Sequence, residues 1–402
     1  HDMKPRRSLM ISPITPAIGG NGLAMRMGLF SDALARVSET HVLVIPIAGD
    51  LPAGAPLSGA LRMHRVDSGG VRAETRFALL SQVADPDERL AAFRDWGRPS
   101  QSAGLSRPIL NAVNRLVQDI APDLVHVGRV GLSPCIGALP TRIPVTLDLD
   151  EDDNVALAMT PTRNPHHAAW LRQEGRACDR MITDYGPRAT RIYVASRGEC
   201  SSLARRHPNL GFSIAQNAAP SVSTRVFPAR SRTALFIGSL SYAPNVEGLV
   251  WFIRRVMPHL AGSGLRLEVA GAGASPELLA LARRSGVVMR GWVPDADAAY
   301  RGAALSILPL LSGGGTRIKL LEAAARGIPF VATRRAAAGL DLPPESGWFA
   351  DDPRDFAICI RSILSDHATV HRRAGLARRH VNKCHSRTAI IRGLAHDLDS
   401  VF

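Results

Sequence analysis

Residues 312–327 read Ser-Gly-Gly-Gly-Thr-Arg-Ile-Lys-Leu-Leu-Glu-Ala-Ala-Ala-Arg-Gly. The stretch follows an apolar run at 305–308 and precedes another at 330–332, so the pattern predicts strand, glycine loop, helix and strand in that order. Consecutive glycines let backbone N–H groups approach a ligand closely, and the helix start that follows them is an anion site. We therefore expect an anionic ligand at this loop.

Two cations, Arg317 and Lys319, occupy the first turn of the expected helix. The helix dipole is positive at that end, so each cation there costs ~0.3–1 kcal/mol, and a bound diphosphate would reverse the sign. Glu322 follows Lys319 by three residues on the same face, where a carboxylate suits the hydroxyls of a ribose. The alternative is a plain turn with a Lys319–Glu322 surface pair. Arg326 is interpreted as decoration of the helix C-terminus.

The rest of the chain alternates short apolar runs with helix-period segments. Strands are expected at 9–11, 42–45, 124–127, 145–147, 192–194, 234–238, 265–269, 287–289, 305–308 and 330–332, with helices starting near residues 23, 246, 276 and 353 and an Arg-rich helix from about 368. Such alternation predicts an α/β protein with two doubly wound, Rossmann-like parallel sheets facing an interdomain cleft. Residues 50–105 show no period and are expected to be irregular.

The length of 402 residues exceeds what one hydrophobic core supports, so two domains are expected. The predicted boundaries are an N-terminal domain over 3–215, a linker over 216–233, a C-terminal domain over 234–380, and a C-terminal helix over 381–402 that packs back on the N-terminal domain. The segments around Tyr193–Arg197 and Gln216-Asn217 are interpreted as hinge elements between the domains.

The composition carries a formal net charge of +14, from 49 basic and 35 acidic residues. A GC-rich genome would produce such an Arg excess, and so would an anionic ligand, an acidic membrane surface or nucleic acid. Aromatic residues make up 5% of the chain, too few for the stacking platforms of single-strand binders. Five scattered cysteines disfavour disulfides and zinc and favour a reducing cytoplasm. No apolar run has transmembrane length or follows Met3–Arg7 as a signal peptide would.

The pattern Gly-Gly-Gly-Thr-Arg-x-Lys-Leu-Leu-Glu-Ala-x-Ala-x-Gly-x-Pro-x-Val-Ala-Thr over 313–333, with Ala-Gly-Leu at 338–340, resembles the donor-binding signature of GT-B glycosyltransferases of the family 4 type, the glycosyl transferases group 1. The resemblance extends upstream through 236–240, Pro244-Asn245, 269–273 and 290–293, and more loosely into the N-terminal half. Members transfer a sugar from a nucleotide-diphosphate donor to an acceptor, usually with retention of configuration and without a metal.

The resemblance implies a donor site in the C-terminal domain made of Gly238, Ser239, Gly313, Gly314, Gly315, Thr316, Arg317, Lys319, Leu320 and Glu322. Arg317 and Lys319 would hold the diphosphate of a UDP- or GDP-sugar and stabilise its charge during transfer, with no protein nucleophile, no metal and no further cofactor. Two departures stand out. Gly314 occupies the position of a frequent Glu, and residues 238–248 lack the usual Arg and Lys, so the diphosphate charge rests on Arg317 and Lys319.

In the N-terminal half, Pro13 followed by Gly19-Gly20-Asn21 resembles the family loop that borders the transferred sugar and phosphate; a plain turn is the alternative. His126 lies in a strand that resembles one with two histidines, where the second position is Gly128. His126 is a catalytic candidate or a core residue, and Arg129 is a candidate contact for the acceptor or phosphate. The acidic run 148–153 is expected to cap a helix; a metal or a polyol acceptor is the alternative.

The resemblance implies a hexosyltransferase-type glycosyltransferase, which we expect in the cytoplasm, either free or peripheral at the inner membrane face. Its partners would be a nucleotide-sugar donor and a hydroxyl acceptor on a glycan, a lipid-linked sugar or a natural product. The alternatives are a sugar-nucleotide epimerase or phosphorylase of the same fold and, less favoured, a basic nucleic-acid-binding protein. The identity of the sugar, the base and the acceptor does not follow from the residues.

Overall fold

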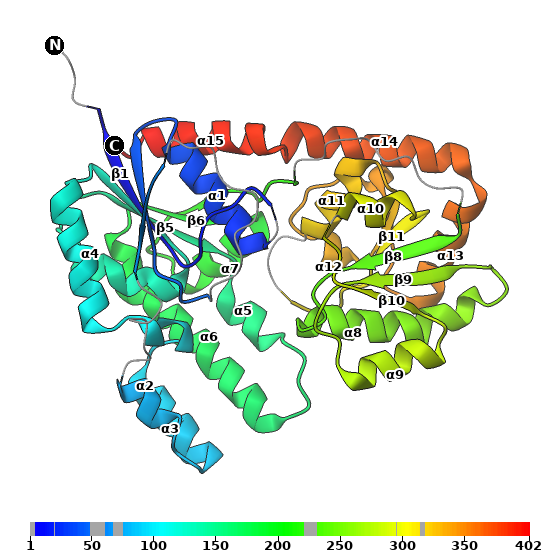
Figure 1. Ribbon diagram of the computed structural model, residues 1–402, viewed down its shortest axis with the longest axis horizontal. Coiled ribbons are helices and arrows are strands. Elements are labelled where there is room, and N and C mark those ends of the chain that lie inside the picture. Colours follow the sequence, from blue (N-terminus) through cyan, green and yellow to red (C-terminus); the bar gives the residue numbers. More distant parts are fainter. Residues whose placement is uncertain are drawn as a thin grey trace. The chain divides into compact units, whose positions relative to one another are not determined.

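A computed structural model of the chain describes residues 5–19, 21–48, 61–66, 75–220, 231–294, 296–313 and 318–402. The chain forms two compact units. Unit 1 comprises His1–Ala158, Thr162–Asn217 and Arg387–Phe402, and unit 2 comprises Met159–Pro161 and Ala218–Ser386. Each unit is built on one parallel sheet with helices on its faces (Figure 1). None of the helices in the described ranges is both long and apolar enough to cross a membrane.

The sheet of unit 1 has the strand order β3-β2-β1-β4-β5-β6-β7. Its strands are β1 (Arg7–Ser12), β2 (Glu39–Val44), β3 (Arg62–Arg65), β4 (Leu124–Gly128), β5 (Val145–Asp150), β6 (Arg191–Val194) and β7 (Phe212–Ile214). All pairings are parallel, and the apolar strands are buried on both sides. From β1 the chain adds strands toward one edge of the sheet and from β4 toward the other, so the strand order reverses between β1 and β4. Parallel α/β sheets bind ligands at the strand carboxyl ends beside such a reversal.

The helices of unit 1 are α1 (Gly22–Leu34), α2 (Thr75–Leu80), α3 (Pro86–Trp96), α4 (Arg107–Ile120), α5 (Asp153–Ala158), α6 (Pro165–Tyr185), α7 (Arg197–Arg206) and α15 (Arg387–Asp399). Helix α4 buries Ile109, Val113 and Val117 at a spacing of one turn. Helix α15 packs on α1, where Arg387 donates to Asp32 at 2.6 Å.

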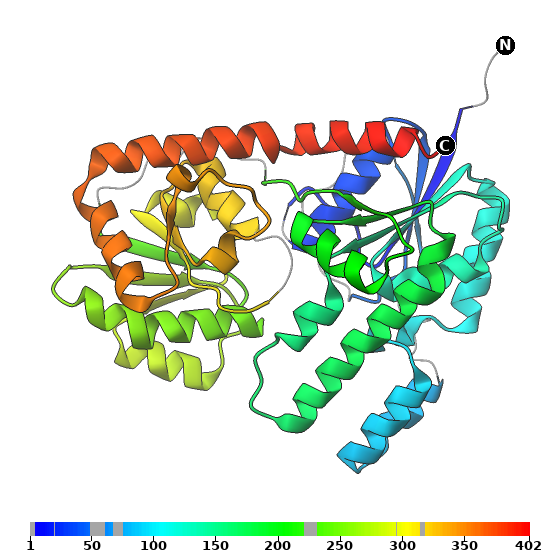
Figure 2. The same ribbon diagram turned by 180° about the vertical axis from the view of Figure 1, so that it is seen from behind.

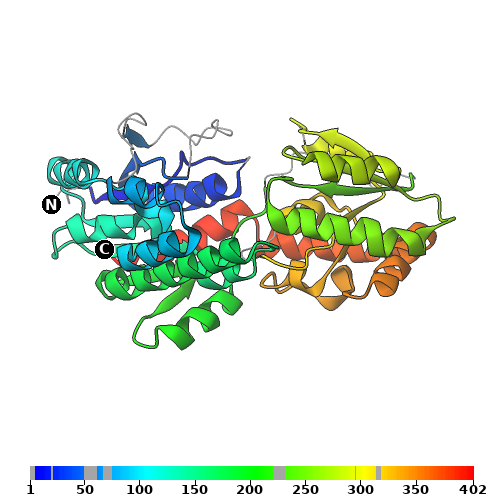
Figure 3. The ribbon, with the colours of Figure 1, turned by 90° about the horizontal axis from the view of Figure 1, so that it is seen from below.

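The region that lacks periodicity in the sequence is more regular than expected. Residues 49–60 and 67–74 lie outside the described residues, but strand β3, helices α2 and α3 and a short 3-10 helix at Ser100–Gly104 occupy the rest. The ribbons of α2, α3 and α6 lie close together (Figure 3). Ring contacts join them: Phe77 meets Trp96 at 5.2 Å, and Phe93 stacks on Trp170 at 4.0 Å. The expectation of irregular structure is therefore wrong for 75–104, because aromatic packing supplies the order that an apolar stripe normally supplies.

The sheet of unit 2 has the order β10-β9-β8-β11-β12-β13. Its strands are β8 (Thr233–Ile237), β9 (Arg266–Ala270), β10 (Val288–Gly291), β11 (Leu305–Leu308), β12 (Phe330–Ala332) and β13 (Trp348–Phe349), and its helices are α8 (Ala243–Trp251), α9 (Pro276–Arg284), α10 (Ala296–Arg301), α11 (Ile318–Arg326), α12 (Arg334–Ala337), α13 (Pro353–Ser365) and α14 (His367–Cys384). A π-helical turn, Phe252–Val256, continues α8. The reversal in strand order falls between β8 and β11.

Two helical layers enclose this sheet (Figure 2). On one face, Trp251 and Phe252 at the end of α8 make edge contacts with Phe356 of α13. On the other face, α11 packs against α14, with Leu320 and Val381 in one apolar cluster. All ten strands expected from the sequence are present in the two units, and the doubly wound fold class is confirmed. Strands β3, β7 and β13 were not expected; each is short.

The sequence suggested that Arg326 lies on the surface at the C-terminus of its helix, and this expectation is wrong. Its side chain is 4% exposed and pairs with Asp297 of α10 at 2.6 Å, with its guanidinium over the Tyr300 ring at 4.9 Å. The residue therefore ties α11, the helix of the expected anion site, to α10.

A buried ion pair joins α1 to the centre of the unit 1 sheet. Arg26 is 1% exposed and donates through Nε and Nη2 to the two carboxylate oxygens of Asp148 at 2.7 and 2.6 Å. Its remaining nitrogen, Nη1, donates to the carbonyl of Ala215 and to Asn217. The pair thereby anchors the last residues of unit 1 before the chain enters unit 2.

We expect Asp148→Asn to lower the free energy of unfolding by about 3–5 kcal/mol, because it removes the bidentate counter-ion of the buried Arg26 guanidinium and leaves only the half-buried Asp150, 3.2 Å from Nε. Urea unfolding of the full chain measures the loss. The control is Asp399→Asn, which breaks the exposed Arg6–Asp399 pair and should cost less than about 1 kcal/mol. Equal losses in the two variants would contradict this account of the buried pair.

Candidate functional site

The candidate site lies where the strand order of unit 2 reverses, at the carboxyl ends of β8 and β11. Strand β8 leads into Gly238, and β11 leads into the segment Pro309–Gly313. Residues 314–317 lie outside the described residues, so the predicted Gly314, Gly315, Thr316 and Arg317 receive no structural description. Helix α11 starts at Ile318 and brings Lys319 to the same edge of the sheet.

The Lys319 ammonium is held in place by neighbouring groups. Its Nζ donates to Asn245 Oδ1 at 2.8 Å and lies 5.9 Å from the centre of the Phe236 ring. Asn245 is 2% exposed, and its own amide nitrogen donates to the carbonyl of Ser239 at 2.7 Å. This second bond fixes the orientation of the Asn245 side chain, so the oxygen faces the ammonium.

Gly238 leaves the space that the Lys319 ammonium occupies. A Cβ on Gly238 would lie 2.2 Å from Lys319 Nζ, and a Cβ on Gly271 would lie 1.8 Å from the Gly238 carbonyl oxygen. The loops after β8 and β9 therefore approach each other and the lysine as closely as backbone permits. The predicted donor residue Gly238 lies at the site, and its close contact is with Lys319.

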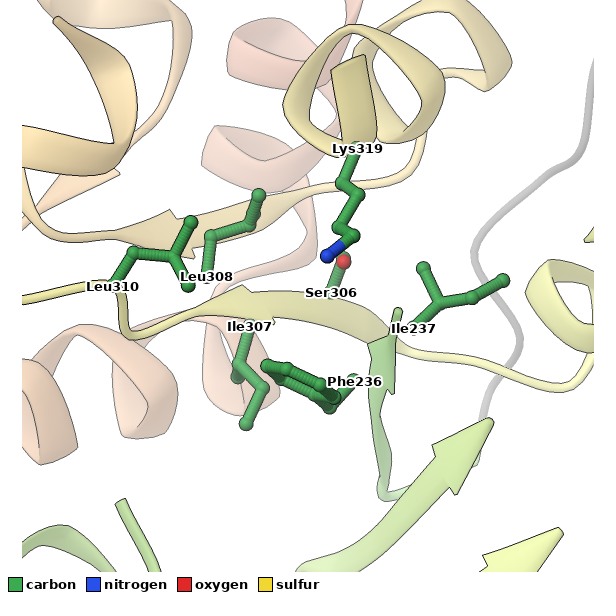
Figure 4. A pocket seen from close by; sticks show the side chains of 7 residues that line it. All are labelled: Phe236, Ile237, Ser306, Ile307, Leu308, Leu310 and Lys319. Carbon is green, nitrogen blue, oxygen red and sulfur yellow. The ribbon is translucent and has the colours of Figure 1, made fainter. Parts of the chain in front are cut away.

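A shallow pocket surrounds the lysine (Figure 4). It is lined by Phe236, Ile237, Ser306, Ile307, Leu308, Leu310 and Lys319. Among these described residues Lys319 alone carries a charge, so the ammonium is the group that the pocket offers to an anion.

Glu322 lies one turn along α11 from Lys319 and is half-buried. Burial raises the pKa of Glu322, and the positive charges of Arg326 and Lys319 oppose that rise. The carboxylate raises the pKa of Tyr300 in addition to the effect of burial, so the two side chains are neighbours. A carboxylate near the ammonium and the pocket is the arrangement that the ribose hypothesis requires.

The remaining predicted donor residues that the structure describes differ in their backbone conformation and burial. Gly313 has a left-handed backbone, with φ of +89°, and a Cβ there would meet Tyr242 Oη at 2.8 Å. Ser239 is exposed and shares a hydrogen bond with the Ser241 hydroxyl. Leu320 is fully buried in the cluster between α11 and α14, so its side chain serves packing.

Two residues of interest were missed as functional candidates. Asn245 appeared in the sequence only as part of a Pro-Asn pair, but it binds Lys319 directly. Trp292 is 72% exposed and follows Gly291, whose carbonyl accepts from Gly271 N at 2.7 Å at the same edge of the sheet. The signals available were a polar residue at the start of an apolar helix and a large aromatic side chain in a chain with few of them.

In unit 1 the predicted loop lies beside the first strand. Gly19 precedes α1 and has open space around it, and Gly20 lies outside the described residues. Asn21 caps α1, because its Oδ1 accepts from the backbone nitrogens of Leu23 and Ala24 at 2.9 and 3.2 Å. The Asn21 oxygen is thus engaged in holding the helix start.

Arg129 follows β4 with a left-handed backbone, φ of 68°. Carboxylates of unit 1 neutralise its charge. It donates to the carbonyl of Leu149 at 2.6 Å and to Asp153 at 2.9 Å, with Glu151 3.4 Å away. These acids raise the pKa of Arg129 despite its burial. The guanidinium is bound to the protein's own carboxylates, which argues against its free use for a substrate phosphate.

His126 is a core residue in this structure, which corrects the catalytic alternative. It has no exposed surface, stacks on Phe30 at 4.2 Å and hydrogen-bonds through Nδ1 with Thr146 Oγ1 at 2.9 Å. Burial, with a smaller contribution from the charge of Arg26, lowers the pKa of His126 to about 3. A buried neutral ring has neither the access nor the charge for contact with a donor.

The acidic run 148–153 forms ion pairs with three arginines. Besides the contacts of Arg26 and Arg129, Asp152 accepts from Arg206 at 2.7 Å and from the backbone of Val155 at the start of α5. Within the described ranges, no group of three or more His, Cys, Asp or Glu side chains is placed to hold a metal ion.

Comparisons with known proteins identify a similar family and similar folds. Residues 231–366 match the family of glycosyl transferases group 1. The search of curated proteins found no match. Among solved structures, sucrose-phosphate synthase from Thermosynechococcus elongatus has a TM-score of 0.70 at 16% identity and covers 99% of each chain.

Two further structures match over the whole chain. HepE of Anabaena, in complex with UDP and glucose, has a TM-score of 0.63 at 13% identity over 99% of this chain and 100% of its own. An α,α-trehalose-phosphate synthase (UDP-forming) from Burkholderia vietnamiensis has a TM-score of 0.64 at 13% identity over 100% of both chains. The fold is therefore GT-B. The match of residues 231–366 to the glycosyl transferases group 1 family supports a glycosyltransferase.

We expect Gly238→Ala and Gly347→Ala to separate binding from stability. The new Cβ at 238 meets the flexible end of Lys319, so the free energy of unfolding should stay within about 1 kcal/mol while UDP affinity falls at least ~10-fold. At 347 the Cβ meets the Phe330 ring at 2.3 Å, so the fold should lose about 1–3 kcal/mol while UDP affinity stays unchanged. Calorimetry measures the affinities and urea unfolding the stabilities. Equal losses of affinity in the two variants would contradict the assignment of Gly238.

His126 should make unit 1 acid-sensitive. Because folding lowers its pKa from 6.5 to about 3, the unfolded chain binds the extra proton between these values and stability falls as pH falls. From pH 7.5 to pH 5 the loss from this residue is about 2 kcal/mol. Urea unfolding at both pH values should show a smaller loss in His126→Gln by about that amount. The same pH dependence in both proteins would refute the assignment.

Proposed function

We propose that the protein transfers a hexosyl group from a nucleoside-diphosphate sugar to a hydroxyl acceptor. The observation that carries the proposal is the Lys319 ammonium, held by Asn245 and accommodated by Gly238 where the strand order of unit 2 reverses. Its place in the first turn of α11 is unfavourable next to the positive end of the helix dipole. A donor diphosphate bound there supplies the compensating negative charge.

The proposed chemistry relies on placement and charge. Lys319 and Arg317 bind the diphosphate and stabilise the negative charge that grows on it as the sugar leaves. Holding donor and acceptor together supplies the remaining acceleration, so no protein nucleophile is needed. We infer a retaining, metal-independent reaction of the family 4 type, which the Lys-Leu-Leu-Glu pattern at 319–322 supports.

The rest of the donor is proposed to extend along the carboxyl edge of the unit 2 sheet. Glu322 binds the ribose hydroxyls. Trp292 follows β10, two strands from β8, and at about 4.8 Å per strand the separation is about 10 Å, which a nucleoside diphosphate can bridge. An exposed indole at this edge of the sheet offers a stacking surface for the base.

UDP is the favoured nucleotide over GDP, because two of the similar structures carry UDP in their names. We propose that unit 2 binds this donor and that unit 1 binds the acceptor, a glycan, a lipid-linked sugar or a natural product. A cytoplasmic location, with or without contact to the inner membrane face, agrees with the reduced cysteines and the basic composition.

Two reactions of the same fold remain as alternatives. An epimerase would release an altered sugar nucleotide without any acceptor, and a phosphorylase would require inorganic phosphate. Thermal stabilisation by a panel of UDP, GDP, ADP and dTDP identifies the base, since a ligand that binds the folded state raises its apparent stability. Product analysis with and without acceptor then separates the three reactions.

Lys319→Met should reduce sugar transfer at least ~100-fold, equivalent to about 2.7 kcal/mol on the barrier, because it removes the diphosphate's cation. Arg317→Met should act in the same way. The matched control is Lys383→Met on α14, an exposed lysine that should leave transfer unchanged. Transfer rates with the nucleotide sugar selected by the panel provide the measurement. Normal transfer by both Lys319→Met and Arg317→Met would overturn the proposed function.

A further inference from the structure

Helix α8 packs along the segment that follows β11. Pro244, Glu247 and Gly248 share one face of α8, at spacings of three and four residues. A Cβ on Gly248 would lie 2.3 Å from the Pro309 oxygen, and a Cβ on Gly313 would lie 3.0 Å from Pro244 Cγ. The helix and the segment thus touch at both ends of 309–313 with no room for an added atom.

A hydrogen bond joins the helix and the segment between these two contacts. Ser312 Oγ donates to Glu247 Oε2 at 2.5 Å. Ser312 is buried and Glu247 is half-buried, and a hydroxyl that donates to a carboxylate over so short a distance forms a charge-assisted bond. The bond fixes Ser312, the residue directly before the left-handed turn at Gly313.

The same helix holds the Lys319 ammonium from another side, through Asn245. Asn245 and Glu247 are two positions apart, so they point to different sides of α8. One helix therefore sets both the path of the chain as it leaves β11 and the position of the ammonium in α11. The negative charge of Glu247 is unfavourable for an anion bound at the nearby site. A carboxylate in such an unfavourable place indicates a functional role.

We propose that Glu247 is a positioning residue for the donor, and that it acts through Ser312 on the turn at Gly313. The inference rests on the proposed function, since it assumes that a nucleoside diphosphate binds beside this turn. Glu247 does not contact the donor. It keeps the backbone at 312–313 in the conformation that binds the diphosphate, and its effect on affinity passes through the Ser312 hydroxyl.

A double-mutant cycle tests this path. UDP affinity is measured by calorimetry for the wild type, Glu247→Ala, Ser312→Ala, the double variant and Glu247→Gln, with melting temperatures recorded for all. Each single Ala variant should lose about tenfold in affinity, and the double variant should lose no more than a single one, because all three remove the same bond. Glu247→Gln should bind within about twofold of the wild type, since its amide oxygen still accepts from Ser312.

The matched control is Glu277→Ala, which removes a second Ser–Glu contact of unit 2, the one with Ser275 at the start of α9. It should leave UDP affinity unchanged. A hundredfold loss in the double variant would show that Glu247 acts independently of Ser312, and it would overturn the inference. So would wild-type affinity in Glu247→Ala. If the wild type binds none of UDP, GDP, ADP and dTDP, the proposed function itself fails.

Should Glu247→Ala melt at a much lower temperature than the wild type, Ser312→Ala and Glu247→Gln still decide the matter, because neither removes the carboxylate's packing volume from α8. Loss of affinity in Ser312→Ala with recovery in Glu247→Gln supports the positioning role. Unchanged affinity in Ser312→Ala contradicts it.

Discussion

The arrangement of unit 2 depends on an ammonium group that stands at the positive end of a helix. Lys319 is stabilised there by the Asn245 oxygen, the Phe236 ring and the absence of a side chain at Gly238. These three neighbours are uncharged, and the carboxylate of Glu322, one turn along α11, interacts with the ammonium electrostatically. The close approach of the loops after β8 and β9, the packing of α8 on 309–313 and the anchoring of α11 by Arg326 all keep this one cation in place.

In unit 1, by contrast, the buried cations at the sheet edge are paired with carboxylates. Arg26 and Arg129 are bound by Asp148 and Asp153, and Arg129 and Asp150 end neighbouring strands in left-handed conformations that residues other than glycine rarely adopt. The ion pairs supply the energy that holds these strand ends. The same carboxyl edge of a parallel sheet is thus closed by internal salt bridges in unit 1 and left open around a lysine in unit 2.

Local patterns predicted most of the fold. Apolar runs such as 305–308 and caps such as Ser275 and Asp352 were sufficient because short-range physics decides them. Residues 75–104 escaped prediction because their order comes from Phe93 and Trp170, which are 77 positions apart in the sequence. For the site, the glycine loop and Lys319 were evident, whereas the partnership with Asn245 and the burial of His126 depend on contacts between elements that no sequence spacing specifies.

The discontinuity of unit 1 has a consequence for how the protein is made. Helix α15 supplies Arg387 to Asp32 and Asp397 to Tyr193, so unit 1 gains these contacts only after unit 2 has been synthesised. On the ribosome, the residues of unit 2 emerge while α1 still lacks the helix that packs on it. The nascent chain therefore completes unit 2 before unit 1, and a truncation before Arg387 would leave the α15-facing side of α1 uncovered.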